Sequence, residues 1–195
     1  MQITLNQVKN LSYVVVDDLY SSEEVIQIKA ELDSLLLYLK EPTSLATACD
    51  ENGNLKKNGM GLFIDGHYAN RDDSAILKFN RKIFCKEIAN KATELNQFFY
   101  TLCKCNSDYT LVNYYAAGGE YKPHTDDSAI TVLTFFSLGE ITGGDLIFPE
   151  SGAVVPFKEN RAVIFPGCAL HAAQETIAEP GMFRISIAQF LNYVG

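Results

Sequence analysis

The stretch YTLVNYYAAGGEYKPHTD, residues 109–126, marks where the chain changes from helical to strand-like patterning. From here on, short apolar runs follow one another, separated by glycine, proline and aspartate. Evenly spaced short strands with turn signals between them predict a β-sandwich or a barrel. We expect about eight strands, the number found in a double-sheet jelly roll: 109–116, 121–125, 130–138, 144–148, 153–157, 162–165, 169–176 and 183–192.

Two helical segments are expected ahead of this core. Residues 22–40 place valine, isoleucine and leucine at helical spacing, and Ser21 with Glu24 forms a capping box at the start. Residues 74–102 repeat the pattern, with Ser74 as a natural N-cap. The predicted fold class is therefore α+β: a double-stranded β-helix (jelly roll) core with N-terminal helices packed on one sheet.

Length and composition predict a single domain over residues 1–195, with 1–108 as helical support and a candidate lid and 109–195 as the jelly-roll core. Apolar residues make up 47% of the chain, which indicates a packed globule. The net charge of -8 disfavours nucleic acid as a partner. The sequence contains no run of about 18 apolar residues, so no membrane span is predicted. No secretory signal is recognised, so we expect a cytoplasmic location.

The segment 41–73 between the two helical regions has an irregular pattern. Residues 45–49 and 60–64 are expected as short strands of a hairpin around Asn52-Gly53, a turn signal. Its length and its turn-forming residues suggest that 52–68 is a mobile lid over the substrate. A tolerated surface insertion is the alternative interpretation.

Several other residues receive structural interpretations. The five cysteines, an odd number, match no zinc module and are interpreted as free buried thiols in a reducing compartment. The pairs Lys56-Lys57 and Arg81-Lys82 are interpreted as solvated surface. His67 lies in a polar loop and is interpreted as a surface histidine.

The other two histidines fall in strand-like contexts. His124 and Asp126 are two residues apart, which on a strand places both side chains on the same face. His171 follows 45 residues after Asp126, and a jelly roll can bring such distant strands together. Two histidines and one carboxylate with open positions form the facial triad of Fe(II) oxygenases. The pair alone is weak evidence, because Asp126 could instead begin a turn.

The motifs around this set, taken in order, resemble the prolyl-4-hydroxylase-like branch of the Fe(II)/2-oxoglutarate dioxygenases. Residues 114–126 look like the family's strand entering the metal site, and GGDLIFP at 143–149, RAVIF at 161–165, His171 and RIS at 184–186 follow in the family's order. The resemblance covers about 109–191. It implies a hydroxylase with Fe(II), 2-oxoglutarate and O2, and ascorbate as a further candidate, in which His124, Asp126 and His171 are the catalytic metal ligands.

The same resemblance assigns the co-substrate site. It implies that Arg184 pairs with the distal carboxylate of 2-oxoglutarate, which its planar guanidinium fits bidentately. Ser186 adds a hydroxyl to the same carboxylate, and Tyr115 and Tyr121 are the aromatic candidates beside it. Core packing is an equally good interpretation for either tyrosine. For Arg184 the alternative is a strand face that points to solvent.

The implied reaction converts 2-oxoglutarate to succinate and CO2 while an aliphatic C–H bond is hydroxylated. Peptidyl proline and a free amino acid are the substrates considered, so the partner is a peptide or a small molecule. One alternative is an oxidative nucleic-acid demethylase, but that branch requires Asn and Arg where Ser186 and Phe190 stand. The other is a non-catalytic cupin-like binding protein, which leaves an inward Arg184 unexplained.

Overall fold

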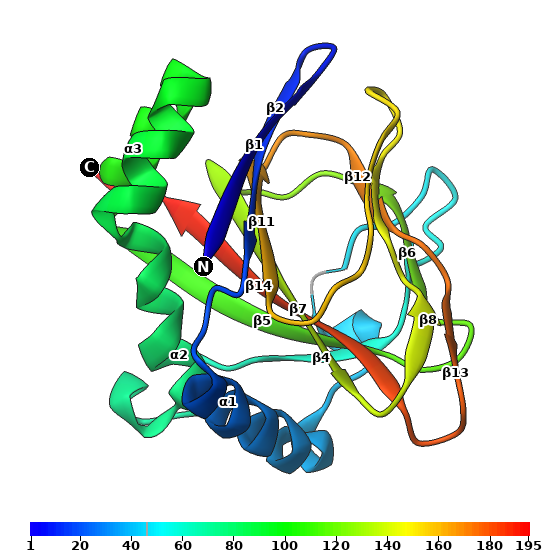
Figure 1. Cartoon of the computed structure of the whole chain (residues 1–195). Helices are drawn as coiled ribbons and strands as arrows, with labels where there is room; N and C mark the ends of the chain where they lie inside the picture. The colour runs from blue at the N-terminus through cyan, green and yellow to red at the C-terminus, as the bar shows by residue number, and fades with distance from the viewer. Residues whose placement is uncertain (46) are drawn as a thin grey trace.

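The computed structural model describes residues 1–45 and 47–195, and most of its strands form two facing sheets (Figure 1). The larger sheet has the order β1-β2-β11-β7-β14-β5-β4, the smaller β10-β9-β12-β6-β3, and β13 pairs with β8. All pairings are antiparallel. The strands are β1 (Gln2–Val8), β2 (Leu11–Asp17), β3 (Lys57–Asn58), β4 (Met60–Phe63), β5 (Ser107–Tyr115), β6 (Glu120–His124), β7 (Ile130–Leu138), β8 (Ile141–Gly143), β9 (Leu146–Phe148), β10 (Ala153–Val155), β11 (Arg161–Pro166), β12 (His171–Ala173), β13 (Thr176–Ala178) and β14 (Phe183–Asn192).

The helices cover the outer face of the larger sheet, as Figure 1 shows, so the predicted α+β jelly roll with helices on one sheet is confirmed. The α-helices are α1 (Ser22–Leu35), α2 (Ala75–Phe79) and α3 (Lys86–Leu95). Short 3-10 turns extend or join them: Leu36–Tyr38, Pro42–Ser44, Arg71–Asp73, Asn80–Phe84 and Gln97–Cys103. No described helix has the length and apolar content needed to cross a bilayer.

The capping box at Ser21 and Glu24 forms as predicted and starts α1. The second expected helix, 74–102, is instead broken into α2, a 3-10 turn, α3 and a second 3-10 turn. Cys85 and Asn96 have extended backbone at the two breaks, and the Asn96 side chain accepts a hydrogen bond from Phe98 N. The breaks contain no glycine or proline, so apolar periodicity alone did not reveal them.

The region before the helices was predicted incompletely. β1 and β2 form a hairpin that extends the larger sheet, and β2 pairs with β11. β2 alternates between the two faces of the sheet, with Tyr13 and Val15 in one core cluster and Val14 and Val16 in the other. The segment before the helices therefore contributes two strands to the larger sheet.

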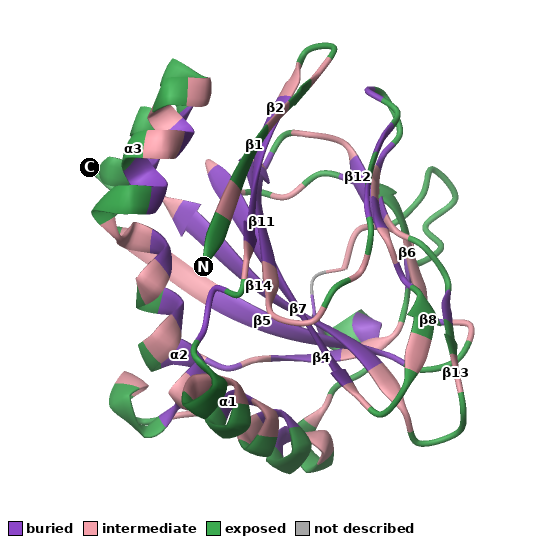
Figure 2. Ribbon diagram, viewed as in Figure 1, coloured by how far each residue is buried: buried purple, intermediate pink, exposed green. Residues whose placement is uncertain are grey.

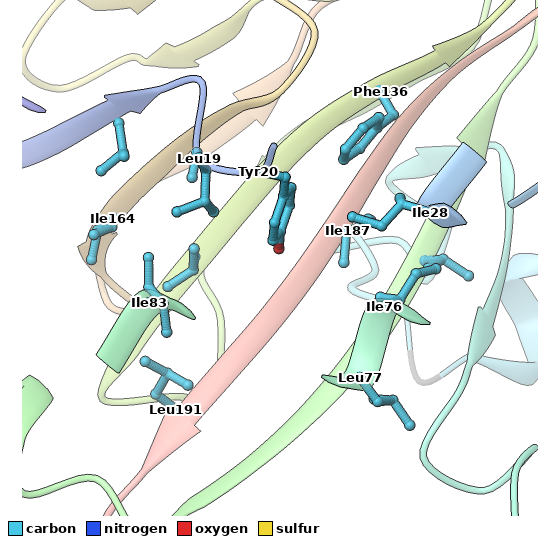
Figure 3. Close-up of a cluster of buried hydrophobic side chains, with 14 of the residues drawn as sticks. Leu19, Tyr20, Ile28, Ile76, Leu77, Ile83, Phe136, Ile164, Ile187 and Leu191 are labelled. Carbon is cyan, nitrogen blue, oxygen red and sulfur yellow. The ribbon is translucent and has the colours of Figure 1, made fainter. Parts of the chain in front are cut away.

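Strand alternation gives β14 two buried faces (Figure 2). Ile185 and Ile187 point outward and pack with residues of the helices, as Figure 3 shows for Ile187, Ile28 and Ile76. Arg184, Ser186, Ala188 and Phe190 lie on the opposite face of the strand and point between the two sheets. The strand thus contributes both to the helix-side core and to the interior of the jelly roll.

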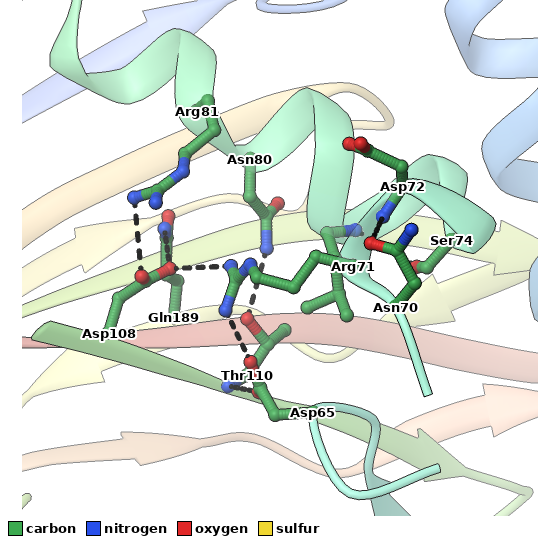
Figure 4. Close-up of polar contacts among 11 residues, drawn as sticks. Asp65, Asn70, Arg71, Asp72, Ser74, Asn80, Arg81, Asp108, Thr110 and Gln189 are labelled. Atoms are coloured by element: carbon green, nitrogen blue, oxygen red, sulfur yellow. Dashed lines mark hydrogen bonds and ion pairs between the residues drawn. The ribbon is translucent and has the colours of Figure 1, made fainter. Parts of the chain in front are cut away.

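Polar contacts anchor the helical segments to the same sheet (Figure 4). The carboxylate of Asp108 on β5 accepts from Arg71 Nη2 at 3.0 Å, Arg81 Nη1 at 3.3 Å and Gln189 Nε2 at 2.8 Å. Arg71 also donates to Asp65 at 2.6 Å. These contacts hold the helical turns against β5 and leave the opposite face of that strand free to line a cavity.

The segment 41–73 contributes strands to both sheets. β4 pairs with β5 and β3 pairs with β6, so the expected hairpin of 45–49 with 60–64 is wrong. A smaller turn forms instead: Asp50 accepts from the backbone of Asn52 and Asn54, and a single bridge joins Cys49 to Leu55. Residue 46 of the expected strand lies outside the described residues. Only the part before β3 is left as a candidate cover.

The expectation of buried thiols is also wrong. Cys49, Cys103 and Cys168 are exposed, and Cys85 and Cys105 are partly buried. All five are free, as predicted. His67 is exposed, as predicted, with its ring against Tyr38 at 4.6 Å between centroids.

Candidate active site

The structure brings His124, Asp126 and His171 together between the two sheets. His124 ends β6 and His171 begins β12, and the two are direct cross-strand partners. The candidate ligand atoms of the three residues all lie within 4.8 Å of one another. Asp126 Oδ2 is 3.4 Å from His171 Nε2, and Asp126 Oδ1 is 3.8 Å from His124 Nε2. This is the compact donor set that the sequence spacing suggested.

Asp126 reaches the cluster by a different route from the one predicted. It lies two residues beyond the end of β6, so it does not share a strand face with His124. Its backbone N–H donates to Gly167 O at 2.9 Å, and its Oδ2 accepts from Thr131 Oγ1 at 2.7 Å. These two bonds orient the carboxylate toward the histidines.

Both imidazoles are held in one tautomer. His124 Nδ1 lies 2.9 Å from Lys122 O, and His171 Nδ1 lies 2.9 Å from Ala169 O. A carbonyl oxygen only accepts hydrogen bonds, so each Nδ1 carries the proton. Each Nε2 lone pair is therefore free on the side that faces Asp126, and such contacts are typical of metal-ligating histidines.

Burial controls the charge of these groups. Desolvation, with a smaller contribution from His171, lowers the pKa of His124 to about 3, so this imidazole is neutral at physiological pH. Burial raises the pKa of Asp126 above its usual value. A divalent cation would offset the desolvation of this carboxylate, and two imidazoles with one carboxylate suit a first-row metal.

A cavity of about 400 Å³ opens beside the cluster. That volume lies within the range of small-molecule sites. Its apolar lining comes from both sheets and from the segment after α1, and includes Leu45, Phe63, Leu111, Leu133, Leu146 and Phe190. The polar part of its wall includes Arg184 and Ser186, so the cavity connects the donor cluster to a buried positive charge.

Arg184 is only 1% exposed, which excludes the alternative in which it faces solvent. Its guanidinium lies 5.1 Å from the ring centroid of Tyr115 and 5.0 Å from that of Phe135. Two of its buried donors, Nε and Nη2, have no hydrogen-bond partner. An unsatisfied buried donor costs about 1–3 kcal/mol, and more when charged. This guanidinium is therefore suited to an anionic acceptor that the chain itself does not supply.

Gly144 leaves the space that Arg184 occupies. Its φ is +70°, a conformation that favours glycine. A Cβ at this position would lie 3.1 Å from Arg184 Cγ and 3.3 Å from its Nε. Glycine at position 144 therefore leaves room for the Arg184 side chain inside the cavity.

The remaining residues predicted for the co-substrate all line the same cavity. Tyr115 is the cross-strand partner of Arg184, and burial raises the pKa of its hydroxyl. Ser186 Oγ accepts from Asn113 Nδ2 at 3.4 Å. The Tyr121 ring stacks on His124 with centroids 3.5 Å apart, while its hydroxyl accepts from Ala48 N at 3.2 Å. Tyr121 thus supports the histidine and the segment before β3.

Sequence reasoning missed Lys57, because the solvated interpretation of the Lys56-Lys57 pair is wrong for this residue. Lys57 is 5% exposed, lines the cavity, and its Nζ donates to Asn113 Oδ1 at 2.6 Å. The adjacency of two lysines gave no sign of this, because β3 begins at Lys57 and Lys56 lies outside it. The burial of Lys57 follows from the pairing of β3 with β6 and from the contact with Asn113.

Comparison with known proteins identifies the fold. No protein-family model matches the chain, and no curated protein matches it. Among solved structures, a prolyl hydroxylase from Trichoplax adhaerens, in complex with a hypoxia inducible factor oxygen degradation domain peptide fragment, has a TM-score of 0.63 and 13% identity. The match covers 92% of this chain and 83% of the Trichoplax adhaerens chain.

Two further structures agree. A Pseudomonas putida prolyl-4-hydroxylase has a TM-score of 0.61 and 14% identity, with 95% of each chain covered. A viral collagen prolyl hydroxylase from Paramecium Bursaria Chlorella virus-1, solved as a 2OG complex, has a TM-score of 0.58 and 16% identity, covering 93% of this chain and 96% of its own. The chain therefore has the jelly-roll fold of prolyl hydroxylases, with a His-Asp-His cluster inside it.

Proposed function

We propose that this protein is an Fe(II)- and 2-oxoglutarate-dependent dioxygenase that hydroxylates an aliphatic C–H bond. The observation that carries the proposal is the shared cavity: the His124/Asp126/His171 cluster and the unsatisfied guanidinium of Arg184 both line it. Binding a 2-oxo diacid that also coordinates a metal requires two features. One is a metal site with open coordination positions, and the other is a buried cation for the distal carboxylate.

Each residue of the site has a defined role in this proposal. His124, Asp126 and His171 hold the iron, and Arg184 with Ser186 holds the distal carboxylate of 2-oxoglutarate. When bound, the iron supplies O2 activation coupled to oxidative decarboxylation of the co-substrate. The chain contributes orientation, through the locked tautomers and Thr131, and a largely apolar wall that excludes water from the reaction.

The proposed prime substrate is a peptidyl proline or a free amino acid. A peptide is favoured by one similar structure, the Trichoplax adhaerens enzyme, which was solved with a peptide fragment. The nucleic-acid demethylase alternative lacks its second arginine here, because Phe190 stands at that position and lines the cavity. The cupin-like alternative, binding without turnover, predicts no consumption of 2-oxoglutarate.

Succinate release tests the proposal directly. Purified protein with Fe(II), 2-oxoglutarate and O2 should form succinate, and a proline-containing peptide or a free amino acid should increase the rate. Mass spectrometry of the stimulating substrate should show a gain of one oxygen. A chelator should stop both products. Absence of iron-dependent succinate across the whole panel would favour the binding protein.

We also propose that Leu45 and the segment 47–56 cover the substrate end of the cavity. Leu45, Thr47 and Ala48 line the cavity, and Tyr121 holds Ala48 through its hydroxyl. The turn at Asp50–Asn54 beyond them is exposed. A cover of this kind excludes water and holds one C–H bond near the oxidant.

Replacing Glu51–Gly53 by a single glycine should leave 2-oxoglutarate affinity and thermal stability unchanged while hydroxylated product falls relative to succinate. This deletion is confined to the exposed turn, because a longer one would remove the buried Lys57. The ratio of the two products is measured in the same reactions. A wild-type ratio together with a wild-type KM for the prime substrate would show that the turn is a surface insertion.

A further inference from the structure

Lys57 lines the cavity and connects the two sheets. It lies on β3 opposite Tyr121 of the smaller sheet, and its side chain reaches Asn113 on β5 of the larger sheet. Asn113 in turn donates to Ser186, its cross-strand partner on β14. The Lys57 ammonium is therefore linked through Asn113 to Ser186, which lies two residues after Arg184 on β14.

Lys57 and Arg184 are two buried cations beside a single aromatic ring. Lys57 Nζ lies 5.9 Å and Arg184 Cζ lies 5.1 Å from the centroid of Tyr115. Among the described residues, neither cation has a carboxylate within 4.0 Å. Burial lowers the pKa of Lys57 to about 7, a result of desolvation without a compensating anion. Two basic side chains in one cavity, neither paired with a carboxylate, favour the binding of a ligand that carries negative charge.

The backbone around Lys57 is shaped to admit the ammonium. A Cβ on Gly61 would lie 3.1 Å from Lys57 Nζ and 2.8 Å from Val112 O. The bond to Asn113 uses one of the three ammonium donors, so two are left for a ligand. A carboxylate has about four acceptor sites, enough for a guanidinium fork and an ammonium together.

We infer that Lys57 is a second cation for the distal carboxylate of 2-oxoglutarate, which is bound between Lys57 and Arg184. The inference rests on the proposed function. The shared Tyr115 ring and the Asn113–Ser186 link place Lys57 with the co-substrate residues. Lys57 is thus a binding residue that the family resemblance did not supply.

Calorimetric titration of protein loaded with Mn(II), which avoids turnover, tests this inference with two ligands. Lys57→Met should weaken 2-oxoglutarate binding by about tenfold or more, the effect of losing a charge-assisted hydrogen bond. Pyruvate, a 2-oxo acid without a distal carboxylate, should bind both proteins equally. Lys57→Arg should keep part of the 2-oxoglutarate affinity. Lys104→Met is the matched control, because Lys104 is exposed and does not line the cavity, and it should bind as wild type.

The outcomes separate the inference from the proposed function. If wild type binds 2-oxoglutarate and Lys57→Met binds it equally well, the inference is wrong while the proposed function stands. A variant with normal 2-oxoglutarate affinity but a raised KM for the prime substrate also overturns it, assigning Lys57 to that substrate. Equal weakening of pyruvate and 2-oxoglutarate would indicate a structural role only. If wild type binds neither ligand, both proposals fail.

Discussion

His171→Ala should abolish the weak visible charge-transfer band that anaerobic Fe(II) and 2-oxoglutarate are expected to give with the wild-type protein. In the proposed site His171 supplies one of three metal ligands, and its Nε2 is the histidine nitrogen nearer to Asp126, at 3.4 Å against 3.8 Å. Loss of groups that only orient metal ligands already costs about 10- to 100-fold in metal affinity, so loss of a ligand should exceed that.

His67→Ala provides the matched control for this experiment. His67 is exposed, packs against Tyr38 and Tyr68, and does not line the cavity. Its variant should keep the band and the Fe(II) affinity. An unchanged band in His171→Ala, with the fold intact by circular dichroism, would remove His171 from the metal site.

The donor cluster illustrates what sequence spacing can and cannot predict. The two-residue spacing of His124 and Asp126 pointed to a pair that the structure does bring together, but for a reason that holds only in part. β6 ends at His124, and Asp126 is positioned by Gly167 and Thr131, which are distant in sequence. Alternation along a strand is local and can be predicted, whereas hydrogen bonds that reorient a residue after the strand are not.

The same distinction explains β14 and Lys57. A ten-residue strand shows its alternation clearly, and alternation alone places Arg184 and Ser186 on the same face. β3 has only two residues, so its alternation has no statistical signal. What buries Lys57 is the pairing of β3 with β6 and the contact with Asn113, both of which depend on tertiary structure.

The broken helix over 74–102 shows a further limit of apolar periodicity. The apolar stripe over 74–102 is real, because Ile76, Ile83, Ile88 and Phe99 all lie in the helix-side core. The buried Asn80, bonded to Tyr20 and Thr110, also fixes the chain between α2 and α3. Periodicity identified the buried face correctly but carried no information on where the backbone leaves the helical conformation.

Arg184→Ala should lower the affinity for 2-oxoglutarate by about 10- to 100-fold or more while Fe(II) binding persists. A charge-assisted bidentate pair contributes roughly 1.5–3 kcal/mol, and the 1% exposure of Arg184 removes competing water. The proposed metal ligands lie on β6, on β12 and in the segment after β6, and none of their described hydrogen bonds involves the guanidinium. Separate calorimetric titrations with each ligand measure the two affinities.

Two further variants distinguish recognition from packing. Arg184→Lys should recover only part of the affinity, because an ammonium cannot present the planar fork. Arg184→Met fills similar volume without donors, so it should lose 2-oxoglutarate as alanine does while it keeps the core packed. Arg81→Ala, which removes an exposed arginine, should bind normally. If Arg184→Met retained wild-type affinity, the two unsatisfied donors would be a cost of folding and not a receptor, and the case for 2-oxoglutarate at this position would fall.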